Sequence, residues 1–227
     1  MTENPNHPAN ARPLDRTRSA KNVSRALLAP LFLIAFLLSG CQVEPDAYEA
    51  RYLRCMENVE VSTFSVEGSD KIGYVYDGFD EQCLIGAILP SFQSTTLQDL
   101  AVDDSHLEGK INVINTWFME CKPCLAEIPD LNALVDKYGV AEINYWAVTP
   151  DPRSEVEGFL EDHPFAFTII ADGQDLINSR LRLTTGYPTT IVTDEENRIL
   201  AIFKGQSSNG VSTASKLDTL LSTLVTK

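Results

Sequence analysis

This sequence of 227 residues has no apolar run long enough to cross a bilayer, and it has few basic residues. Its longest apolar run covers residues 26–38, whereas a membrane-spanning helix needs roughly 20 residues. Lysine and arginine number 18 against 32 aspartates and glutamates, which gives a formal net charge of −14. Proteins that bind nucleic acid need a basic face to displace counterions, so we expect no nucleic-acid partner.

Candidate metal ligands are also too few for a zinc site. The chain has five cysteines and three histidines, and Cys121 and Cys124 form a C-x-x-C pair that could supply half of such a site. Zinc needs four ligands, and beyond Cys124 the sequence offers only His163. We therefore expect no metal and no cofactor.

The apolar run belongs to an N-terminal segment of distinct composition. Residues 1–40 carry five basic and two acidic residues, and the basic ones precede the apolar run. A short apolar run after positive charge is typical of a secretory signal peptide. The residues that follow the run, Leu38-Ser39-Gly40-Cys41, resemble a bacterial lipobox, in which the cysteine is lipidated and becomes the new N-terminus.

This resemblance implies a lipoprotein signal peptide over 1–40 and a lipid anchor on Cys41. Acyl chains would hold the protein at the periplasmic or other extracytoplasmic face of a membrane, since each buried CH₂ contributes about 0.8 kcal/mol. Gln42 is not the aspartate linked to inner-membrane retention, which favours the outer membrane if the source is Gram-negative. A plain signal peptide with an incidental cysteine, or an uncleaved signal anchor, is the alternative.

We divide the rest of the chain into a tether with an N-terminal extension over 41–84 and a main domain over 85–227. Exported proteins meet an oxidising compartment, so we predict a structural disulfide between Cys55 and Cys83. Closing a loop of about 28 residues would stabilise the fold by on the order of 3 kcal/mol. Two separate buried thiols are the alternative.

Hydrophobic periodicity predicts alternating strands and helices in the main domain. Strands are expected over 111–118, 143–149, 165–170, 189–193 and 199–204, and helices over 121–138, 152–160, 175–181 and 213–225. In the extension, the spacing of Tyr48, Tyr52, Leu53 and Met56 predicts a short amphipathic helix, and 71–76 a strand. Strands that alternate with helices and then end in a hairpin and a helix indicate an α/β fold, with a mixed central sheet and helices on both faces.

The C-x-x-C pair follows an expected buried strand and opens an expected helix, an arrangement typical of redox chemistry. Unpaired N–H groups and the positive dipole end of the helix favour a thiolate at Cys121, and the thiolate is the attacking species in thiol exchange. Lys122 adds a nearby positive charge, and Pro123 suits the first turn because it brings no N–H. We assign Cys121 as the attacking thiol and Cys124 as the resolving thiol of a redox-active disulfide; a purely structural disulfide is the alternative.

Several residues stand at fixed offsets from this pair. Trp117 lies four residues before Cys121 and Asn115 six before it, while Pro129 lies eight after it. The segment 86–92 reads G-A-I-L-P-S-F, and a later loop reads Gly186-Tyr187-Pro188-Thr189. Together these features resemble the TlpA-like family of exported reductases, over roughly residues 85–226. The resemblance implies a thioredoxin-like three-layer fold.

The resemblance also implies supporting roles for Trp117, Tyr187, Pro188 and Glu127. A cis bond before Pro188 would expose the Tyr187 backbone beside the sulfurs, where a substrate chain can pair as an added strand; a trans proline is the alternative. Glu127 shares a helix side with Cys124 and is expected to accept its proton or to tune both sulfurs. A solvated helix carboxylate is the alternative for Glu127.

Glu120 departs from the pattern, because thioredoxin has a tryptophan directly before the first cysteine. A carboxylate there would oppose ionisation of Cys121, and a less stabilised thiolate makes the dithiol a better electron donor. We therefore expect a thiol–disulfide oxidoreductase that reduces disulfides in extracytoplasmic proteins. The resemblance implies disulfide-bearing protein substrates and a membrane electron donor.

Three other functions remain as alternatives. A thiol peroxidase of the peroxiredoxin kind would need a peroxidatic cysteine in a threonine-containing loop of its own, and a C-x-x-C fits exchange better. A non-enzymatic copper carrier of the Sco type pairs C-x-x-x-C with a distant histidine, whereas the spacing here is shorter. A redox-inactive binding module would be expected to have lost one of the two cysteines.

Overall fold

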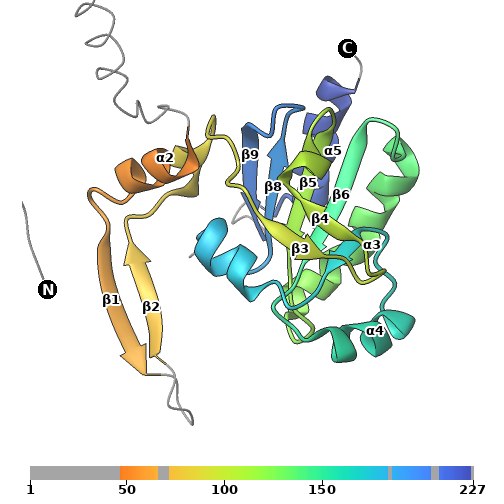
Figure 1. Ribbon diagram of the computed structural model, residues 1–227, viewed down its shortest axis with the longest axis horizontal. Helices are drawn as coiled ribbons and strands as arrows, with labels where there is room; N and C mark the ends of the chain where they lie inside the picture. The colour runs from red at the N-terminus through yellow and green to blue at the C-terminus, as the bar shows by residue number, and fades with distance from the viewer. Residues whose placement is uncertain (1–46, 66–71, 184–185, 206–209, 226–227) are drawn as a thin grey trace, which may run out of the picture. The chain divides into compact units, whose positions relative to one another are not determined.

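The computed structural model describes residues 47–65, 72–183, 186–205 and 210–225 (Figure 1). The expected signal peptide over 1–40 and the expected lipidation site at Cys41 lie outside these ranges. Within the described ranges, no helix combines the length and the apolar character that crossing a membrane requires.

Five strands form the central sheet of the main domain, in the order β7-β6-β5-β8-β9 (Figure 1). They are β5 (Ile111–Thr116), β6 (Ile143–Val148), β7 (Thr168–Ile170), β8 (Thr189–Thr193) and β9 (Ile199–Lys204). β5, β6 and β7 run parallel, whereas β8 is antiparallel to both β5 and β9. Every residue of β5 is buried, because a central strand of this kind is covered on both faces. The mixed sheet predicted from the sequence is confirmed.

Helices cover both faces of this sheet and enclose two apolar cores. The helices α3 (Lys122–Tyr138), α4 (Arg153–Asp162) and α5 (Thr213–Leu224) contribute to the core that contains Val113 of β5. The next residue, Ile114, belongs to the other core, since successive side chains of a strand point to opposite faces. The turn Leu176–Arg180, cyan in Figure 1, and the N-terminal extension contribute to that second core.

Two parts of the main domain differ from the prediction. The helix expected over 175–181 is a π-helical turn, Leu176–Arg180, in which the N–H of Leu181 donates to the carbonyl of Leu176 at 2.9 Å. A hairpin of β3 (Gln93–Thr95) and β4 (Ala101–Asp103), followed by the 3-10 turn η2 (Asp104–Leu107), was not predicted. Strands of three residues are too short for alternation of apolar and polar residues to reveal them.

The extension comprises α2 (Tyr48–Cys55), a hairpin of β1 (Glu60–Ser65) and β2 (Ile72–Asp77), and the 3-10 turn η1 (Glu81–Leu84). The predicted amphipathic helix is confirmed, and α2 buries Tyr48 and Tyr52 in the second core. Leu53 was wrongly counted with its apolar face: the residue is 56% exposed, because it lies about 100° round the helix from Tyr52.

A disulfide joins Cys55, the last residue of α2, to Cys83 in η1, with the two Cα atoms 5.9 Å apart. This is the pair expected from the sequence. Cys55 is half-buried and packs against the second core, whereas Cys83 is exposed, so the bond lies at the edge of that core.

Candidate active site

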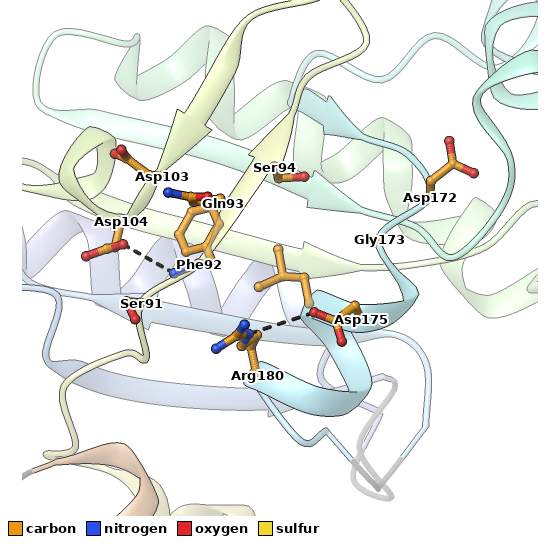
Figure 2. Close-up of a pocket in the computed structure, with 11 residues that line it drawn as sticks. Ser91, Phe92, Gln93, Ser94, Asp103, Asp104, Asp172, Gly173, Asp175 and Arg180 are labelled. Carbon is orange, nitrogen blue, oxygen red and sulfur yellow. Dashed lines mark hydrogen bonds and ion pairs between the residues drawn. The ribbon is translucent and has the colours of Figure 1, made fainter.

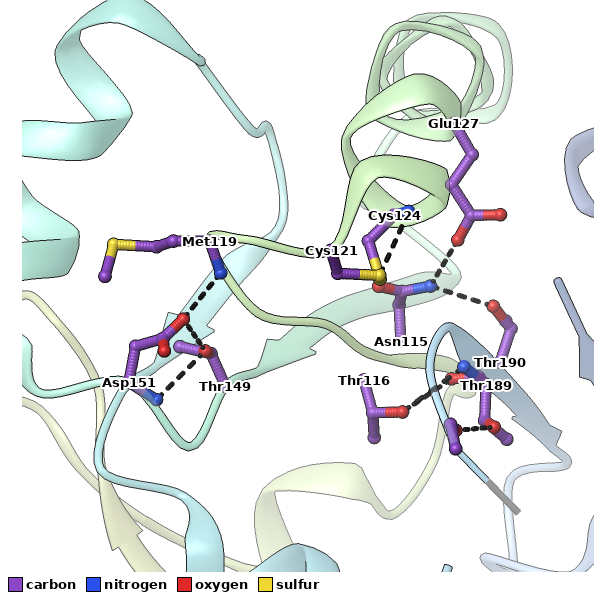
Figure 3. The surroundings of a disulfide bond; sticks show 11 residues. Asn115, Thr116, Met119, Cys121, Cys124, Glu127, Thr149, Asp151, Thr189 and Thr190 are labelled. Atoms are coloured by element: carbon purple, nitrogen blue, oxygen red, sulfur yellow. Dashed lines mark hydrogen bonds between the residues drawn. A yellow bond between two sulfur atoms is a disulfide. The ribbon is translucent and has the colours of Figure 1, made fainter. Parts of the chain in front are cut away.

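A second disulfide, between Cys121 and Cys124, stands at the start of α3 (Figure 3). Cys121 is the residue directly before the helix, and its Sγ accepts a hydrogen bond from the N–H of Cys124 at 3.3 Å. The residues Cys121 and Cys124 are only 4% and 1% exposed. Lys122 and Pro123 occupy the first two helical positions, both exposed. The N–H of Cys124 in the first turn of α3 therefore points at the Cys121 sulfur, the atom that would carry the thiolate charge.

Trp117 anchors the segment that joins β5 to Cys121. It is fully buried, and its backbone N–H donates to the carbonyl of Val148 at the end of β6 at 3.1 Å. Its ring centroid lies 6.0 Å from that of Phe159 and 5.9 Å from that of Phe165. These contacts fix the origin of the loop that leads to the cysteine pair.

Asp151 also holds the loop between β5 and Cys121, and this role was not predicted from the sequence. Its Oδ2 accepts hydrogen bonds from the N–H of Met119 at 2.7 Å and from the hydroxyl of Thr149 at 2.8 Å (Figure 3). Asp151 follows the end of β6, the parallel neighbour of β5, so the two strand ends bring it beside Met119. A polar residue just past that strand was the one sequence feature that could have identified it.

The peptide bond between Tyr187 and Pro188 is cis, as the loop motif led us to expect. Pro188 directly precedes β8, which runs antiparallel to β5, so the loop lies at the end of the sheet from which the chain continues to Cys121. The N–H of Thr189 donates to Oγ1 of Thr116 at 3.3 Å. The rings of Tyr187 and Phe118 meet edge to face, with centroids 5.1 Å apart.

Asn115 connects the sheet to the active-site helix. It is buried in β5, and its Nδ2 donates to Oε1 of Glu127 at 2.9 Å and to Oγ1 of Thr190 at 3.0 Å (Figure 3). Figure 3 shows its amide beneath the disulfide. Asn115 and Glu127 were singled out from the sequence for separate reasons, but their hydrogen bond depends on how β5 and α3 pack.

Glu127 is partly withdrawn from water. Burial raises the pKa of its carboxyl above the ordinary value, and hydrogen bonds from Asn115 and Thr213 oppose this shift in part. A small hollow of about 120 Å³ borders the carboxyl and is lined by Pro123, Ala126, Glu127, Asp130, Ser212 and Thr213. A carboxyl whose pKa is raised binds a proton more tightly than an exposed glutamate does, and the hollow borders this residue.

A larger hollow, of about 490 Å³, lies away from the cysteine pair (Figure 2). Its lining includes the carboxylates of Asp103, Asp104, Asp172 and Asp175 and the guanidinium of Arg180. Oδ1 of Asp104 accepts a hydrogen bond from the N–H of Phe92, and Nε of Arg180 lies 3.8 Å from Oδ2 of Asp175. Among the described residues that line this hollow none is a cysteine, so the candidate redox site remains at the start of α3.

Comparison with known proteins assigns the fold and the family. The sequence profile of the AhpC/TSA family matches residues 85–202, more than half of the chain. Thiol-disulfide oxidoreductase ResA of Geobacillus kaustophilus is 30% identical over 139 residues, which cover 59% of this chain and 79% of that protein. ResA of Bacillus cereus is 26% identical over 146 residues, or 62% of this chain and 83% of that protein.

Solved structures agree with the thioredoxin-like fold. A putative thiol:disulfide interchange protein DsbE from Chlorobium tepidum aligns with a TM-score of 0.54 at 22% identity, covering 61% of this chain and 96% of that one. A putative thioredoxin from Neisseria meningitidis aligns with a TM-score of 0.50 at 26% identity, covering 60% and 87%. The predicted thioredoxin-like fold is thereby confirmed. The chain belongs to the AhpC/TSA family, and it is a thiol-disulfide oxidoreductase with a thioredoxin-like domain.

Proposed function

We propose that this protein is exported, anchored to a membrane by lipid on Cys41, and reduces disulfides in extracytoplasmic proteins through Cys121 and Cys124. The observation that carries the proposal is the buried disulfide at the start of α3, at the same end of the sheet as the cis bond before Pro188. The proposed working unit is the domain 85–227, which the extension 41–84 joins to the anchor.

The proposed reaction begins from the dithiol form. The Cys121 thiolate attacks one sulfur of a substrate disulfide, forms a mixed disulfide and releases the first substrate thiolate. Cys124 then loses its proton and attacks the Cys121 sulfur. This step releases the second substrate thiolate and forms the Cys121–Cys124 disulfide. Two electrons pass to the substrate, whose two thiolates take up protons, and a membrane electron donor restores the dithiol.

The surroundings of the pair support distinct roles in these steps. The first turn of α3 and the charge of Lys122 favour the attacking thiolate, and Glu120 opposes it. We propose that Glu127 accepts the Cys124 proton in the second step, since its raised pKa makes it a stronger base than an exposed glutamate. The Tyr187 backbone beside Pro188 would pair with the substrate chain as an added strand, and Trp117 would keep the loop in register.

The reduction potential of Cys121/Cys124, measured on soluble residues 42–227 in thiol buffers, is the main test. A reductase is expected near the thioredoxin value of about −270 mV, whereas a value near the DsbA value of about −120 mV would make the protein an oxidant and refute the proposal. Cys121→Ser should abolish insulin reduction, and Cys124→Ser should accumulate a mixed disulfide with the substrate. Full activity of Cys121→Ser would overturn the assignment of the attacking thiol.

Separate assays address the anchor and the alternative functions. Cys41→Ala should move the protein from the membrane fraction to the soluble extracytoplasmic fraction, and an unchanged distribution would argue against lipid on Cys41. Peroxide turnover faster than disulfide exchange would favour a peroxiredoxin-like activity. Tight copper binding that blocks exchange would favour a Sco-like carrier.

A further inference from the structure

The N-terminal extension contacts the chain on both sides of the cis-proline loop. α2 contacts residues 181–182, which lead toward the loop, and η1 contacts β9, the strand beside it. Such contacts would not be needed if the extension served only as a tether. They connect a part of the chain outside the family match to the loop expected to receive substrate.

On the side of α2, the hydroxyl of the buried Tyr48 donates to the carbonyl of Leu181 at 2.5 Å. The carboxylate of Glu49 lies 3.0 Å from the guanidinium of Arg182, which also sits over the ring of Tyr52 at 4.9 Å. Arg182 has φ of 46°, a left-handed conformation that a non-glycine residue keeps only when its surroundings enforce it. α2 supplies several of the contacts that hold this residue.

On the side of η1, the buried carboxylate of Glu81 forms an ion pair with Lys204 at the end of β9. The side-chain amide of Gln82 donates to the carbonyl of Ile202 at 2.9 Å. The residue after Lys204 is Gly205, whose N–H donates to the carbonyl of Pro188 at 3.0 Å. The end of β9 that η1 holds is therefore bonded to the cis-proline itself.

The disulfide Cys55–Cys83 joins these two sets of contacts, because Cys55 ends α2 and Cys83 lies in η1. We propose that α2 and η1, joined by this disulfide, form a brace that sets the position of the cis-proline loop for protein substrates, with Tyr48 and Arg182 as positioning residues. This inference rests on the proposed function, in which that loop binds the substrate chain.

A brace of this kind acts on substrate binding and not on the sulfur chemistry. Loosening it should raise KM for a protein substrate, which must pair with the loop, and leave kcat and the reduction potential of Cys121/Cys124 unchanged. A small disulfide such as oxidised glutathione needs no pairing with the Tyr187 backbone, so its rate should not change. A purely structural role would lower all rates together, in proportion to the folded fraction.

The test compares Tyr48→Phe with Tyr138→Phe in the full chain, purified in detergent. Tyr138 is the matched control, because its hydroxyl donates to Asp218 on α5 and its ring packs against the other core, to which α2 does not contribute. Tyr48→Phe should raise KM for insulin by about three- to tenfold, the effect of one buried hydrogen bond. It should also speed hydrogen exchange at the Thr189 amide, while Tyr138→Phe should do neither.

An unchanged KM and unchanged exchange in folded Tyr48→Phe, or equal changes in Tyr138→Phe, would overturn the brace. If Tyr48→Phe does not fold, Glu49→Gln removes only an exposed partner of Arg182 and gives the same two readouts. A wild-type chain that fails to reduce insulin refutes the proposed function instead. In that case hydrogen exchange at Thr189 still decides whether the brace exists.

Discussion

At the scale of the residue, Glu127 is a carboxyl group partly withdrawn from water, three residues beyond Cys124 on α3. Burial raises its pKa in the folded protein, so the folded state binds this proton more tightly than the unfolded state does. Folding stability from this group is therefore greatest below the unfolded pKa of about 4.3 and is lost as pH rises through the folded pKa. As pH rises from the unfolded pKa to the folded pKa, the free energy of unfolding of Glu127→Gln should increase relative to that of wild type. Above the folded pKa this difference should stay constant.

Urea denaturation of the oxidised protein at a series of pH values measures this difference without titration of the cysteines. Glutamine keeps an oxygen for the hydrogen bond from Asn115, so packing is preserved. Glu161→Gln, on the exposed side of α4, is the control for loss of one negative charge. A constant difference between Glu127→Gln and wild type at all pH values would contradict the raised pKa.

Asp151 is the other residue whose role follows from contacts rather than from a motif. A single oxygen, Oδ2, accepts from both Met119 and Thr149, so asparagine can keep both hydrogen bonds and alanine can keep neither. Asp151→Ala should cost about 1–3 kcal/mol of unfolding free energy and slow single-turnover reduction of insulin. Asp151→Asn should keep most of the unfolding free energy and most of the rate of insulin reduction. If Asp151→Asn is as slow as Asp151→Ala, the charge matters and the hydrogen bonds do not.

At the scale of the element, the sequence predicted what is determined locally. Strand β5 was recognised because its β-branched residues leave a local pattern, and α3 was recognised because its start after Cys121 and its end before Gly139 leave one too. The hairpin of β3 and β4 has no such local sequence pattern. The N–H of Leu97, in the turn of this hairpin, donates instead to the carbonyl of Ile169, which is distant in sequence. The contacts of Asp151 and Asn115 were unpredictable for the same reason, since each needs the register of neighbouring strands.

The disulfide Cys55–Cys83 gives an element-level prediction, because it ties α2 to η1 across a separation of 28 residues. The double variant Cys55→Ser/Cys83→Ser should lose on the order of 3 kcal/mol of unfolding free energy by the chain-entropy account. Chemical denaturation, with the Cys121–Cys124 disulfide kept oxidised in both proteins, measures the loss. Equal stability would mean that the unfolded chain gains no freedom when the bond is absent.

At the scale of the whole molecule, the relevant property is the net charge, which is summed over all parts of the chain. Residues 41–227 hold 13 basic and 30 acidic residues, a formal net charge of −17, so the expected mature chain is strongly anionic. Charges of one sign create a field that attracts oppositely charged partners and repels like-charged ones over distances set by salt. The Debye length falls from about 30 Å at 0.01 M to about 8 Å at 0.15 M ionic strength.

This field should therefore speed the association of basic substrates and slow that of acidic ones, before either contacts the cis-proline loop. For a basic peptide disulfide, kcat/KM should fall by about tenfold between these two ionic strengths, whereas for an acidic peptide of the same length it should rise. A neutral peptide of that length is the control for salt effects on the sulfur chemistry itself, and its kcat/KM should change little. If all three peptides respond equally to salt, the net charge does not steer association, and selection among substrates must occur at the loop and its brace.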